Sequence, residues 1–488
     1  MPLRPYLLIA IFAVCAERHA SGEDFFLTIG GGYAPSGNQA SLENNVLFFQ
    51  RVLREQGADH GNNDIYFADG NDRGKDLQVM DPDSIPLANQ LMAEFFGSRS
   101  SLGLSYRNHK IPNVRGNTRP EQIRKWFSET GSKMKAEDRL MLFVTAHGNR
   151  SRDSRNPYDT TIATWDNTSI KMTEFVKLLD GLPSGVQVIA VMVQCHAGGF
   201  AKFIFNGGDP DRGLSSQNRC GFFATVHDRS AAGCTPEVDE KSYVEYSTYF
   251  WAALSGRSRT GDPIERPDYN GDGVIGLDEA HAYTVLTADT IDLPIKSSGE
   301  FLSEYSKFAE EDSALLSDEE PYSLILELAS ATDRAVLEGL SEQLDLKGED
   351  RLTEAGKEAR PERGRGRSRR RREESPSDRL KHRIANDIER RWPELANVVN
   401  PVAVELMTSR SGEFIDAIQQ HADYQRYREL TEQPETDEAK RRVKYERFLR
   451  TADNVVLAEN LKRIGNRQHL DQYKAILDAE AGPFIHRD

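Results

Sequence analysis

Two residues of this chain have the chemistry of a nucleophile and its base, and each follows an apolar segment. His147 comes directly after residues 139–146, and Cys195 comes shortly after residues 186–193. A thiolate attacks carbonyl carbon, while a neighbouring imidazole takes the thiol proton and later returns it to a leaving amine. We therefore expect acyl transfer at Cys195, with His147 as its acid–base partner.

Glycines beside these two residues fit the same chemistry. Gly148 leaves the backbone next to His147 uncovered. Its N–H is therefore expected to approach a tetrahedral oxyanion, with the N–H of Cys195 as the second donor. Gly198 and Gly199 permit a tight turn after the nucleophile. The plainer interpretation is a buried thiol at a strand end and a hydrogen-bonded histidine in a loop.

The surrounding sequence predicts the elements that would position this pair. Short apolar runs alternate with segments of helical periodicity. Strands are expected at 25–29, 65–67, 139–146, 186–193 and 221–226, and helices at 42–53, 119–127 and 172–182. Such alternation predicts a parallel sheet with helices on both faces, where ligands bind beyond the carboxyl ends of the strands. Residues 69–118, rich in Gly, Asn, Asp and Pro, are expected to form a long surface excursion.

A second motif lies between residues 268 and 279. Its order of acidic, amide and glycine positions is that of an EF-hand-type calcium loop followed by a helix. The expected ligands are Asp268, Asn270, Asp272, the carbonyl of Val274 and Glu279. Calcium at this loop would be structural or activating. The plainer alternative is an ordinary acidic turn before a helix.

Length and charge limit the function classes. The chain has 488 residues and a net charge of -15, with 38% hydrophobic residues. That length predicts about two or three domains. Binding to a phosphate backbone draws mainly on Lys and Arg, so the acidity argues against nucleic acid as the main partner. A protein or peptide substrate is the expected partner.

The N-terminus, residues 1–22, has the pattern of a signal peptide: Arg4, then an apolar run at 7–14, then small residues. We expect export, to the periplasm or the outside of the cell, with no membrane association after cleavage. The alternatives are a first buried strand or a membrane anchor, although the run is shorter than the ~20 residues of a spanning helix.

Three cysteines remain after signal cleavage: Cys195, Cys220 and Cys234. An odd number outside the cell leaves two arrangements open. Either Cys220 and Cys234 form a disulfide and Cys195 is the free thiol, or all three are reduced and buried.

The remaining chain divides by composition. A peptidase domain is expected at 23–260, and the calcium loop with its helix at 261–300. An acidic helical segment follows at 301–358, then an arginine-rich linker at 359–377 that is too polar to form a core. A separate helical module is expected at 378–488, where apolar residues recur at helical spacing.

An apolar strand ending in His-Gly, followed by one ending in Cys, resembles the caspase-like superfamily of cysteine peptidases (clan CD). The residues Cys195-His-Ala-Gly198 are most similar to the Cys-Glu-Ser-Gly of the legumain family. Phe223-Ala-Thr225 and Ser230-Ala-Ala-Gly-Cys234 resemble legumain's Tyr-Ala-Thr and Glu-Ser-Ser-x-Ala-Cys. Gly37-Asn-Gln-Ala40 falls where legumain has Arg-His-Gln-Ala. The resemblance covers residues 24–255.

The resemblance implies a caspase-like α/β fold, a three-layer sandwich around a mainly parallel sheet, followed here by an all-α module. It implies His147 as catalytic histidine, Cys195 as nucleophile and Gly148 as oxyanion donor. Gln194 and Gly37-Asn38 depart from the legumain pattern, so asparaginyl specificity is not implied. Glu245 and Asp228 are candidates for a pocket that takes a basic P1 side chain.

Legumains also have a C-terminal helical segment that blocks their active site. By analogy, residues 375–488 would inhibit the enzyme until the linker is cut, and the alternative is an independent interaction or dimerising module. Two further functions use the same sequence features. One is a catalytically inactive fold that serves as a calcium-dependent binding module, and the other is a transpeptidase with the same Cys–His dyad.

Overall fold

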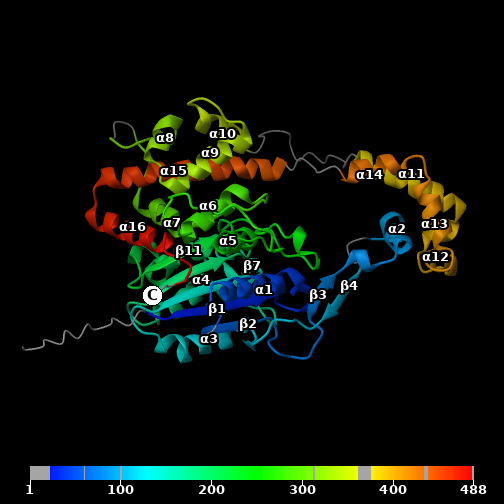
Figure 1. Ribbon diagram of the computed structural model, residues 1–488, viewed down its shortest axis with the longest axis horizontal. Helices are drawn as coiled ribbons and strands as arrows, with labels where there is room; N and C mark the ends of the chain where they lie inside the picture. The colour runs from blue at the N-terminus through cyan, green and yellow to red at the C-terminus, as the bar shows by residue number, and fades with distance from the viewer. Residues whose placement is uncertain are drawn as a thin grey trace, which may run out of the picture.

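A seven-stranded sheet lies at the centre of this computed structural model (Figure 1). The structure describes residues 22–59, 61–98, 102–310, 314–360, 375–432 and 438–485. The expected signal peptide, apart from Gly22, lies outside the described residues, and so do residues 361–374 of the expected linker.

The strands of this sheet are ordered β12-β11-β10-β6-β1-β2-β5. All neighbours are parallel except β11 and β12, which are antiparallel. The strands are β1 (Asp24–Gly31), β2 (Asn62–Phe67), β5 (Val114–Gly116), β6 (Arg139–Ala146), β10 (Gln187–Met192), β11 (Arg219–Phe223) and β12 (Ile295–Lys296). All eight residues of β6 are buried, as expected of a central strand covered on both faces.

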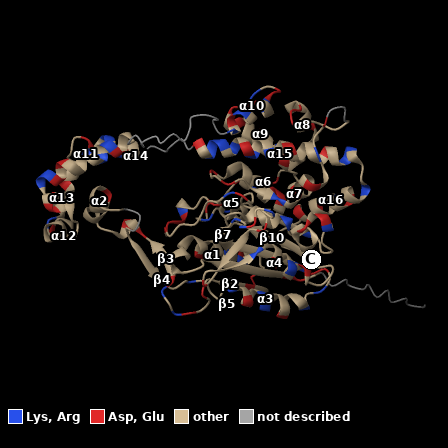
Figure 2. Cartoon of the chain, turned by 180° about the vertical axis from the view of Figure 1, so that it is seen from behind, with Lys and Arg blue, Asp and Glu red and all other residues tan. Residues whose placement is uncertain are grey.

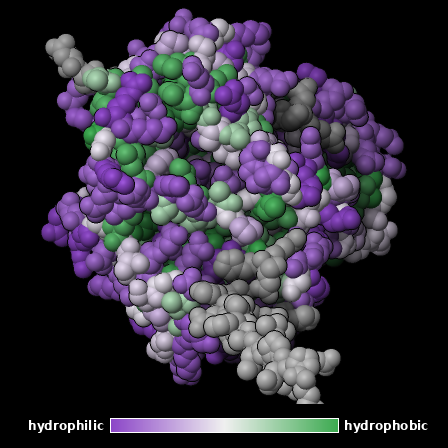
Figure 3. All heavy atoms as spheres, turned by 60° about the vertical axis from the view of Figure 1, so that its left-hand side comes forward, coloured by the Kyte–Doolittle hydropathy of each residue, from purple (hydrophilic) through white to green (hydrophobic). Residues whose placement is uncertain are grey.

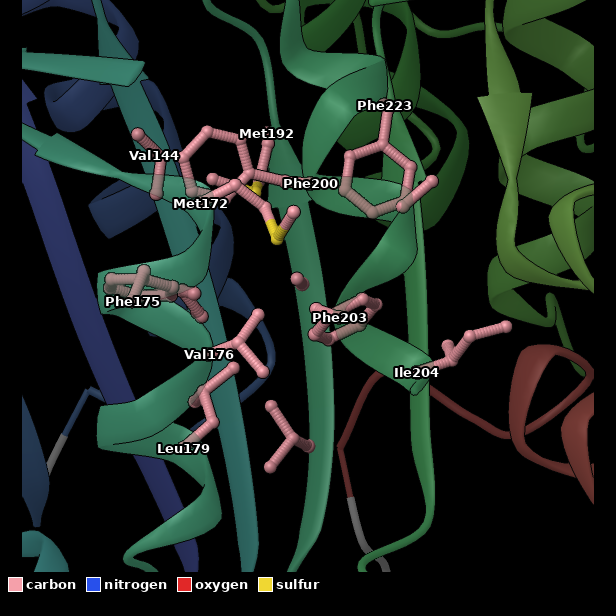
Figure 4. Packing of buried hydrophobic residues seen from close by; sticks show 14 of the residues in the cluster. Val144, Met172, Phe175, Val176, Leu179, Met192, Phe200, Phe203, Ile204 and Phe223 are labelled. Carbon is pink, nitrogen blue, oxygen red and sulfur yellow. The ribbon is translucent and has the colours of Figure 1, made fainter. Parts of the chain in front are cut away.

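Helices cover both faces of the sheet. On one face lie α1 (Ala40–Glu55) and α5 (Tyr246–Ser255), and on the other lie α3 (Pro120–Glu129), α4 (Met172–Asp180), the 3-10 helix η5 (Ala197–Ile204) and α7 (Ser297–Tyr305). Figure 4 shows the second face, where side chains of α4 and η5 pack against Val144 of β6, Met192 of β10 and Phe223 of β11. The α/β fold class, with three layers and a mainly parallel sheet, is confirmed.

Two small sheets extend from the carboxyl edge of the central sheet. One contains β7 (Gly148–Asn149), β8 (Thr161–Thr164) and β9 (Thr168–Lys171). The other is a hairpin of β3 (Leu77–Met80) and β4 (Leu104–Arg107), with α2 (Leu87–Phe96) between its strands. Single bridges attach β3 beside the sheet, from Gln78 to Gln39 and from Met80 to Glu237.

The expected helical module at 378–488 divides into two parts that pack on different neighbours. The first comprises α11 (Pro376–Arg391), α12 (Pro401–Met407), α13 (Ser411–Gln419) and α14 (Tyr424–Glu432). It shares a hydrophobic cluster with Ala88, Leu91, Met92 and Phe95 of α2. The segment 69–118 is therefore not only a surface excursion, because its helix α2 packs against the helices α11–α14. Figures 1 and 2 both show these helices apart from the sheet, beyond the β3–β4 hairpin.

The second part is integral to the main body. The helix α15 (Glu438–Ile464) packs with α8 (Tyr322–Leu328), α9 (Ala331–Leu344) and α10 (Arg351–Ala359). Its Leu457 and Leu461, with Ile476 of α16 (Arg467–Glu480), join the core beneath the sheet. Phe484 enters the core on the opposite face, beside Phe26, Phe49 and Trp251. The expectation of one separate module was therefore wrong for residues 438–485, because their apolar faces complete the core of the sheet domain.

The surface is mainly hydrophilic on the side shown in Figure 3, with hydrophobic side chains in scattered groups. Within the described parts of the chain, no helix is both long and apolar enough to cross a membrane.

Candidate active site

The sheet brings the two predicted residues to the same edge. β6 and β10 are parallel neighbours, with Val144 opposite Met192. His147 directly follows β6, and Cys195 lies three residues after β10. The carboxyl ends of these strands adjoin, so both side chains belong to one edge of the sheet. Both residues are half-buried.

His147 is held by one ring nitrogen. Its Nε2 lies 2.8 Å from the carbonyl oxygen of Gly37 and 2.9 Å from Oε1 of Gln39. A backbone carbonyl only accepts hydrogen bonds, so Nε2 carries the proton and Nδ1 holds the free lone pair. The edge of the His147 ring packs against Tyr33, with 5.3 Å between ring centroids. These contacts orient a neutral imidazole as a base through Nδ1.

Burial lowers the pKa of His147 below its ordinary value, opposed by the hydrogen bond from Nε2 to Gly37. The cause is desolvation, which disfavours the charged imidazolium. The neutral form therefore dominates near neutral pH, as a base that must accept a thiol proton requires.

The sulfur of Cys195 contacts one residue of the loop after β11. The N–H of Ala231 donates to Sγ at 3.3 Å, and Sγ lies 3.7 Å from the carbonyl oxygen of Ala231. An N–H donated to sulfur stabilises negative charge on it. No hydrogen bond joins His147 to Cys195 in the part of the chain that the structure describes, so direct proton transfer requires the two side chains to approach each other. Such contacts often tighten only when substrate binds.

Gly148 packs directly on the Cys195 backbone. A Cβ atom placed on Gly148 would lie 2.0 Å from the carbonyl oxygen of Cys195 and 2.8 Å from Cγ of Gln194. Any side chain at position 148 would displace one of these groups. The close approach explains why glycine follows His147.

The N–H of Gly148 is not used by the neighbouring small sheet. Gly148 pairs with Ile162, but the N–H of Ala163 donates to the carbonyl oxygen of His147 at 2.8 Å. That bond makes Gly148 and Ile162 a non-hydrogen-bonded pair, in which facing residues exchange no bonds. Among the described residues, neither the N–H of Gly148 nor that of Cys195 donates to another protein group. Both N–H groups are therefore free donors within the described residues, and a candidate oxyanion hole needs two such donors.

The turn after the nucleophile differs from expectation in one detail. His196 has the left-handed conformation, with φ of 63°, rather than Gly198 or Gly199. The glycines serve close packing instead: a Cβ on Gly198 would lie 2.7 Å from the carbonyl oxygen of Thr225, and one on Gly199 would lie 2.5 Å from that of Tyr158. They allow η5 to lie directly against its neighbours.

A buried polar network supports the end of β6. Thr145 accepts a hydrogen bond from Asn45 at 3.0 Å, and Asn45 accepts one from Arg259 at 2.6 Å. The guanidinium of Arg259 also pairs with Glu245 at 2.9 Å. Glu245 is 1% exposed and caps α5, so it is not free to bind a P1 side chain, and that expectation was wrong. Asp228 is exposed.

The calcium-loop residues adopt a closed loop before α6 (Leu277–Thr287). Asp268 accepts hydrogen bonds from the N–H groups of Gly271 and Gly273, both at 2.9 Å. Glu279 is fully buried and accepts from the N–H groups of Tyr269 and Gly276 at 2.7 and 2.9 Å. Glu279, at the end of the loop, thus holds its second and ninth residues together.

The predicted ligands supply only oxygen donors, which suits calcium. Asn270 and Asp272 are exposed, as is Val274. Within the described residues, no three His, Cys, Asp or Glu side chains converge as a metal site would require. The carboxylates instead satisfy N–H groups of their own loop. The oxygen donor set fits calcium.

The loop also pairs with the C-terminal segment. Gly276 forms an antiparallel bridge with Pro483, and the N–H of Leu277 donates to the carbonyl oxygen of Gly482 at 3.2 Å. Arg139, at the start of β6, donates to the carbonyl oxygens of Pro483 and Phe484. Residues 482–484 therefore link the calcium loop to the sheet.

All three described cysteines are free thiols. Cys220 is buried within β11, whereas Cys234 is exposed. The structure has no disulfide between Cys220 and Cys234, and the other arrangement holds in part, because all three thiols are reduced but only Cys220 is buried.

Comparisons with known proteins add no family. No protein-family model and no curated protein matches the chain. One similar solved structure is the crystal structure of protein GSU0716 from Geobacter sulfurreducens, at 12% identity and a TM-score of 0.32. That similarity covers 56% of this chain and 92% of the other.

Proposed function

We propose that the protein is an exported cysteine endopeptidase of the caspase and legumain kind, with Cys195 as nucleophile and His147 as base. The observation that supports this most directly is the contact of Gly148 with Cys195, which places two unpaired N–H groups beside a half-buried thiol. An inert buried cysteine would have no need of such donors.

The first half of the reaction forms an acyl-enzyme. The thiol proton of Cys195 passes to Nδ1 of His147, and the sulfur bonds to the scissile carbonyl carbon. The N–H groups of Gly148 and Cys195 donate to the oxyanion of the tetrahedral intermediate. The C–N bond then breaks, the proton on His147 passes to the leaving amine, and a thioester remains on Cys195.

In the second half, water gives a proton to His147 and its oxygen attacks the thioester. The acid product leaves and the proton returns to the sulfur. An amine in place of water would yield a new peptide bond by the same steps, which is the transpeptidase alternative. Product analysis of one peptide with and without an added amine nucleophile separates the two reactions.

The test uses an acyloxymethyl ketone probe on the full-length protein. We expect the wild type to be labelled, Cys195→Ala to be unlabelled, and His147→Ala to be labelled at least about 100-fold more slowly. Cys234→Ala serves as matched control, since it removes an exposed thiol outside the dyad. Equal labelling of wild type and His147→Ala would favour the inactive binding module and overturn the peptidase. The labelling rate should decrease on the acid side at a pH below about 6.5, the ordinary pKa of histidine, because burial lowers the pKa of His147.

We also infer that the loop at 268–279 binds calcium through Asp268, Asn270, Asp272, the carbonyl of Val274 and Glu279. Calcium there would fix the entry to α6, and its support is the fully oxygen donor set and the closed loop. The bridge from Gly276 to Pro483 makes the C-terminal segment part of the same structure. A structural role for the ion is therefore favoured.

Export and self-inhibition complete the proposal. Residues 1–22 would be removed on secretion, which N-terminal sequencing of protein from the periplasm or medium tests directly. Any blocking module would be α11–α14, since residues 438–485 belong to the main core. An increase in activity after selective cleavage of the linker would support inhibition, and a change in oligomeric state would support an interaction role instead.

A further inference from the structure

One peptide group lies between the sulfur of Cys195 and a buried carboxyl group. The carbonyl of Ala231 faces Sγ at 3.7 Å, and the N–H of Ala232 donates to Oδ1 of Asp292 at 2.7 Å. These two atoms belong to the same planar peptide unit, whose C=O and N–H point in opposite directions. Asp292 therefore binds the N–H side of the same peptide unit whose carbonyl contacts Cys195.

The Asp292 side chain has few other possible hydrogen-bond partners. Its side chain is 1% exposed, and among the described residues its Oδ2 atom has no hydrogen-bond partner. Its own N–H donates to Oγ1 of Thr290 at 3.1 Å, which fixes the backbone. The N–H of Leu293 donates to Oγ1 of Thr225 at 3.5 Å, so the segment is tied to the residues that follow β11.

Arg447 of α15 holds this segment from the other side. Its guanidinium is 1% exposed and donates to the carbonyl oxygens of Val285 at 3.0 Å and Ala288 at 2.6 Å, and its Nε donates to that of Asp292 at 2.9 Å. A second link runs from Arg229, in the loop after β11, to Glu446 of α15. The helix thus contacts both the loop beside Cys195 and the segment that anchors this loop.

We propose that Asp292 is a positioning residue for Cys195, acting through the Ala231–Ala232 peptide, and that Arg447 of α15 holds it in place. This inference rests on the proposed function. The C-terminal helix is then a support of the active site, in addition to any part that residues 376–432 play in inhibition.

The physical reason is the cost of an unpaired donor. Without an acceptor at position 292, the N–H of Ala232 would have to turn toward water, because a buried unpaired N–H costs about 1–3 kcal/mol. Turning this peptide moves the Ala231 carbonyl away from Sγ and disturbs the adjoining N–H that donates to the sulfur. The thiolate would lose its donor at the moment of attack.

Two substitutions test this. Asp292→Asn removes the charge and keeps an oxygen that accepts from Ala232, whereas Asp292→Leu removes charge and acceptor together. We expect Asp292→Leu to lower kcat and the rate of Cys195 alkylation by iodoacetamide about 10-fold or more, with KM nearly unchanged. Asp292→Asn should stay within about 3-fold of wild type. Equal rates for both variants would overturn the proposal.

Asp289→Asn is the matched control on the same segment. Asp289 pairs with Lys440 and Lys444 of α15 but does not contact the Ala231–Ala232 peptide. Its loss should leave alkylation unchanged. If Asp292→Leu does not fold, hydrogen exchange of the wild type decides the point, since the Ala232 amide must then be protected. Exchange at the rate of an open loop would contradict the inference.

The outcomes also separate this inference from the proposed function. If His147→Ala labels as fast as the wild type, the dyad itself is wrong. If labelling depends on His147 while Asp292→Leu behaves like Asp292→Asn, only the positioning role is wrong.

Discussion

The candidate active site and the predicted calcium loop are built in opposite ways. Every proposed calcium ligand lies within twelve consecutive residues, and the loop bonds mainly to itself. The active site collects His147, Cys195 and Ala231 from three separate strand ends, and Gly37 holds the histidine from a fourth. Local sequence therefore determines the predicted calcium loop, whereas the candidate active site exists only when the whole sheet is formed.

The two sites share one dependence. The calcium loop pairs with Pro483, and the segment beside the nucleophile is held by Arg447. Both contacts come from residues 438–485, after the arginine-rich linker. Removing this part should damage both sites, while a change within either one should leave the other intact.

The largest effect is expected from truncation after residue 432. It would remove Leu457, Leu461, Ile476 and Phe484, all of them buried in the core of the sheet domain. A fully buried side chain of this size contributes about 1.5–3 kcal/mol, so together they approach the whole stability of a domain, about 5–15 kcal/mol. We expect aggregated protein with no probe labelling and no calcium binding.

The matched change is a single cut within residues 361–374, at an inserted protease site. Both pieces should elute together in size-exclusion chromatography and keep the labelled Cys195, because the core contacts are unbroken. Separation of the C-terminal piece under native conditions would show that residues 438–485 are a removable module after all.

The next effect concerns the active site alone. Gly148→Ala places a Cβ 2.0 Å from the carbonyl oxygen of Cys195, so the backbone on one side must move. Displacing one oxyanion donor costs about 10²–10³ in kcat. Gly356→Ala is the control, because a Cβ there meets no other atom within 4 Å. Calcium affinity should be unchanged in both variants, and a kcat near wild type for Gly148→Ala would remove Gly148 from the oxyanion hole.

The sequence was sufficient for the strands that carry the dyad. The runs at 139–146 and 186–193 are mostly apolar because both faces of their strands are covered, and the two strands are neighbours in the sheet. Gly148 was predictable as well, since a glycine after a candidate base indicates close approach to the backbone.

Contacts made by backbone atoms could not be predicted. The carbonyl of Gly37 orients His147, and both the N–H and carbonyl of Ala231 contact Cys195, yet neither residue type indicates such a role. The only sequence signal was the likeness of Gly37-Asn-Gln-Ala40 to a legumain specificity segment, and Gln39 in fact contacts the histidine. Nothing in the sequence indicated that Asp292 is buried beside the candidate site, because acidic residues in loops are usually exposed.

The division of the C-terminal region into two parts could not be predicted from the sequence either. Helical spacing indicates that a helix buries one side, but not which neighbour covers it. α15 is buried by α9 and α10 and by the sheet domain together, and α11–α13 are buried by α2, which lies about 290 residues earlier in the chain.

A smaller effect is expected at the calcium loop. Glu279→Gln removes the proposed bidentate carboxylate while keeping an oxygen that accepts from Tyr269. We expect calcium to raise the melting temperature of the wild type by several degrees and that of the variant by much less, since a bound ligand stabilises by mass action. Glu265→Gln, an exposed acid outside the loop, should respond like the wild type. Equal calcium shifts for Glu279→Gln and wild type would contradict the site, and probe labelling should be similar in all three.

The smallest effect is a pH dependence at the support of the active site. Burial raises the pKa of Asp292 to about 7, with Glu245 adding to the rise and the Ala232 N–H, Arg447 and Thr290 opposing it. The folded state therefore binds more protons than the unfolded state between the ordinary pKa of about 3.9 and pH 7.

The contribution of Asp292 to the free energy of unfolding should therefore fall as pH rises across that window and level off above it. Asp292→Asn lacks the titration, so the stability of the wild type relative to this variant should decline by on the order of 1–4 kcal/mol from pH 4 to pH 8. Denaturant unfolding at both pH values measures the difference, and a constant difference would mean that Asp292 is ionised throughout.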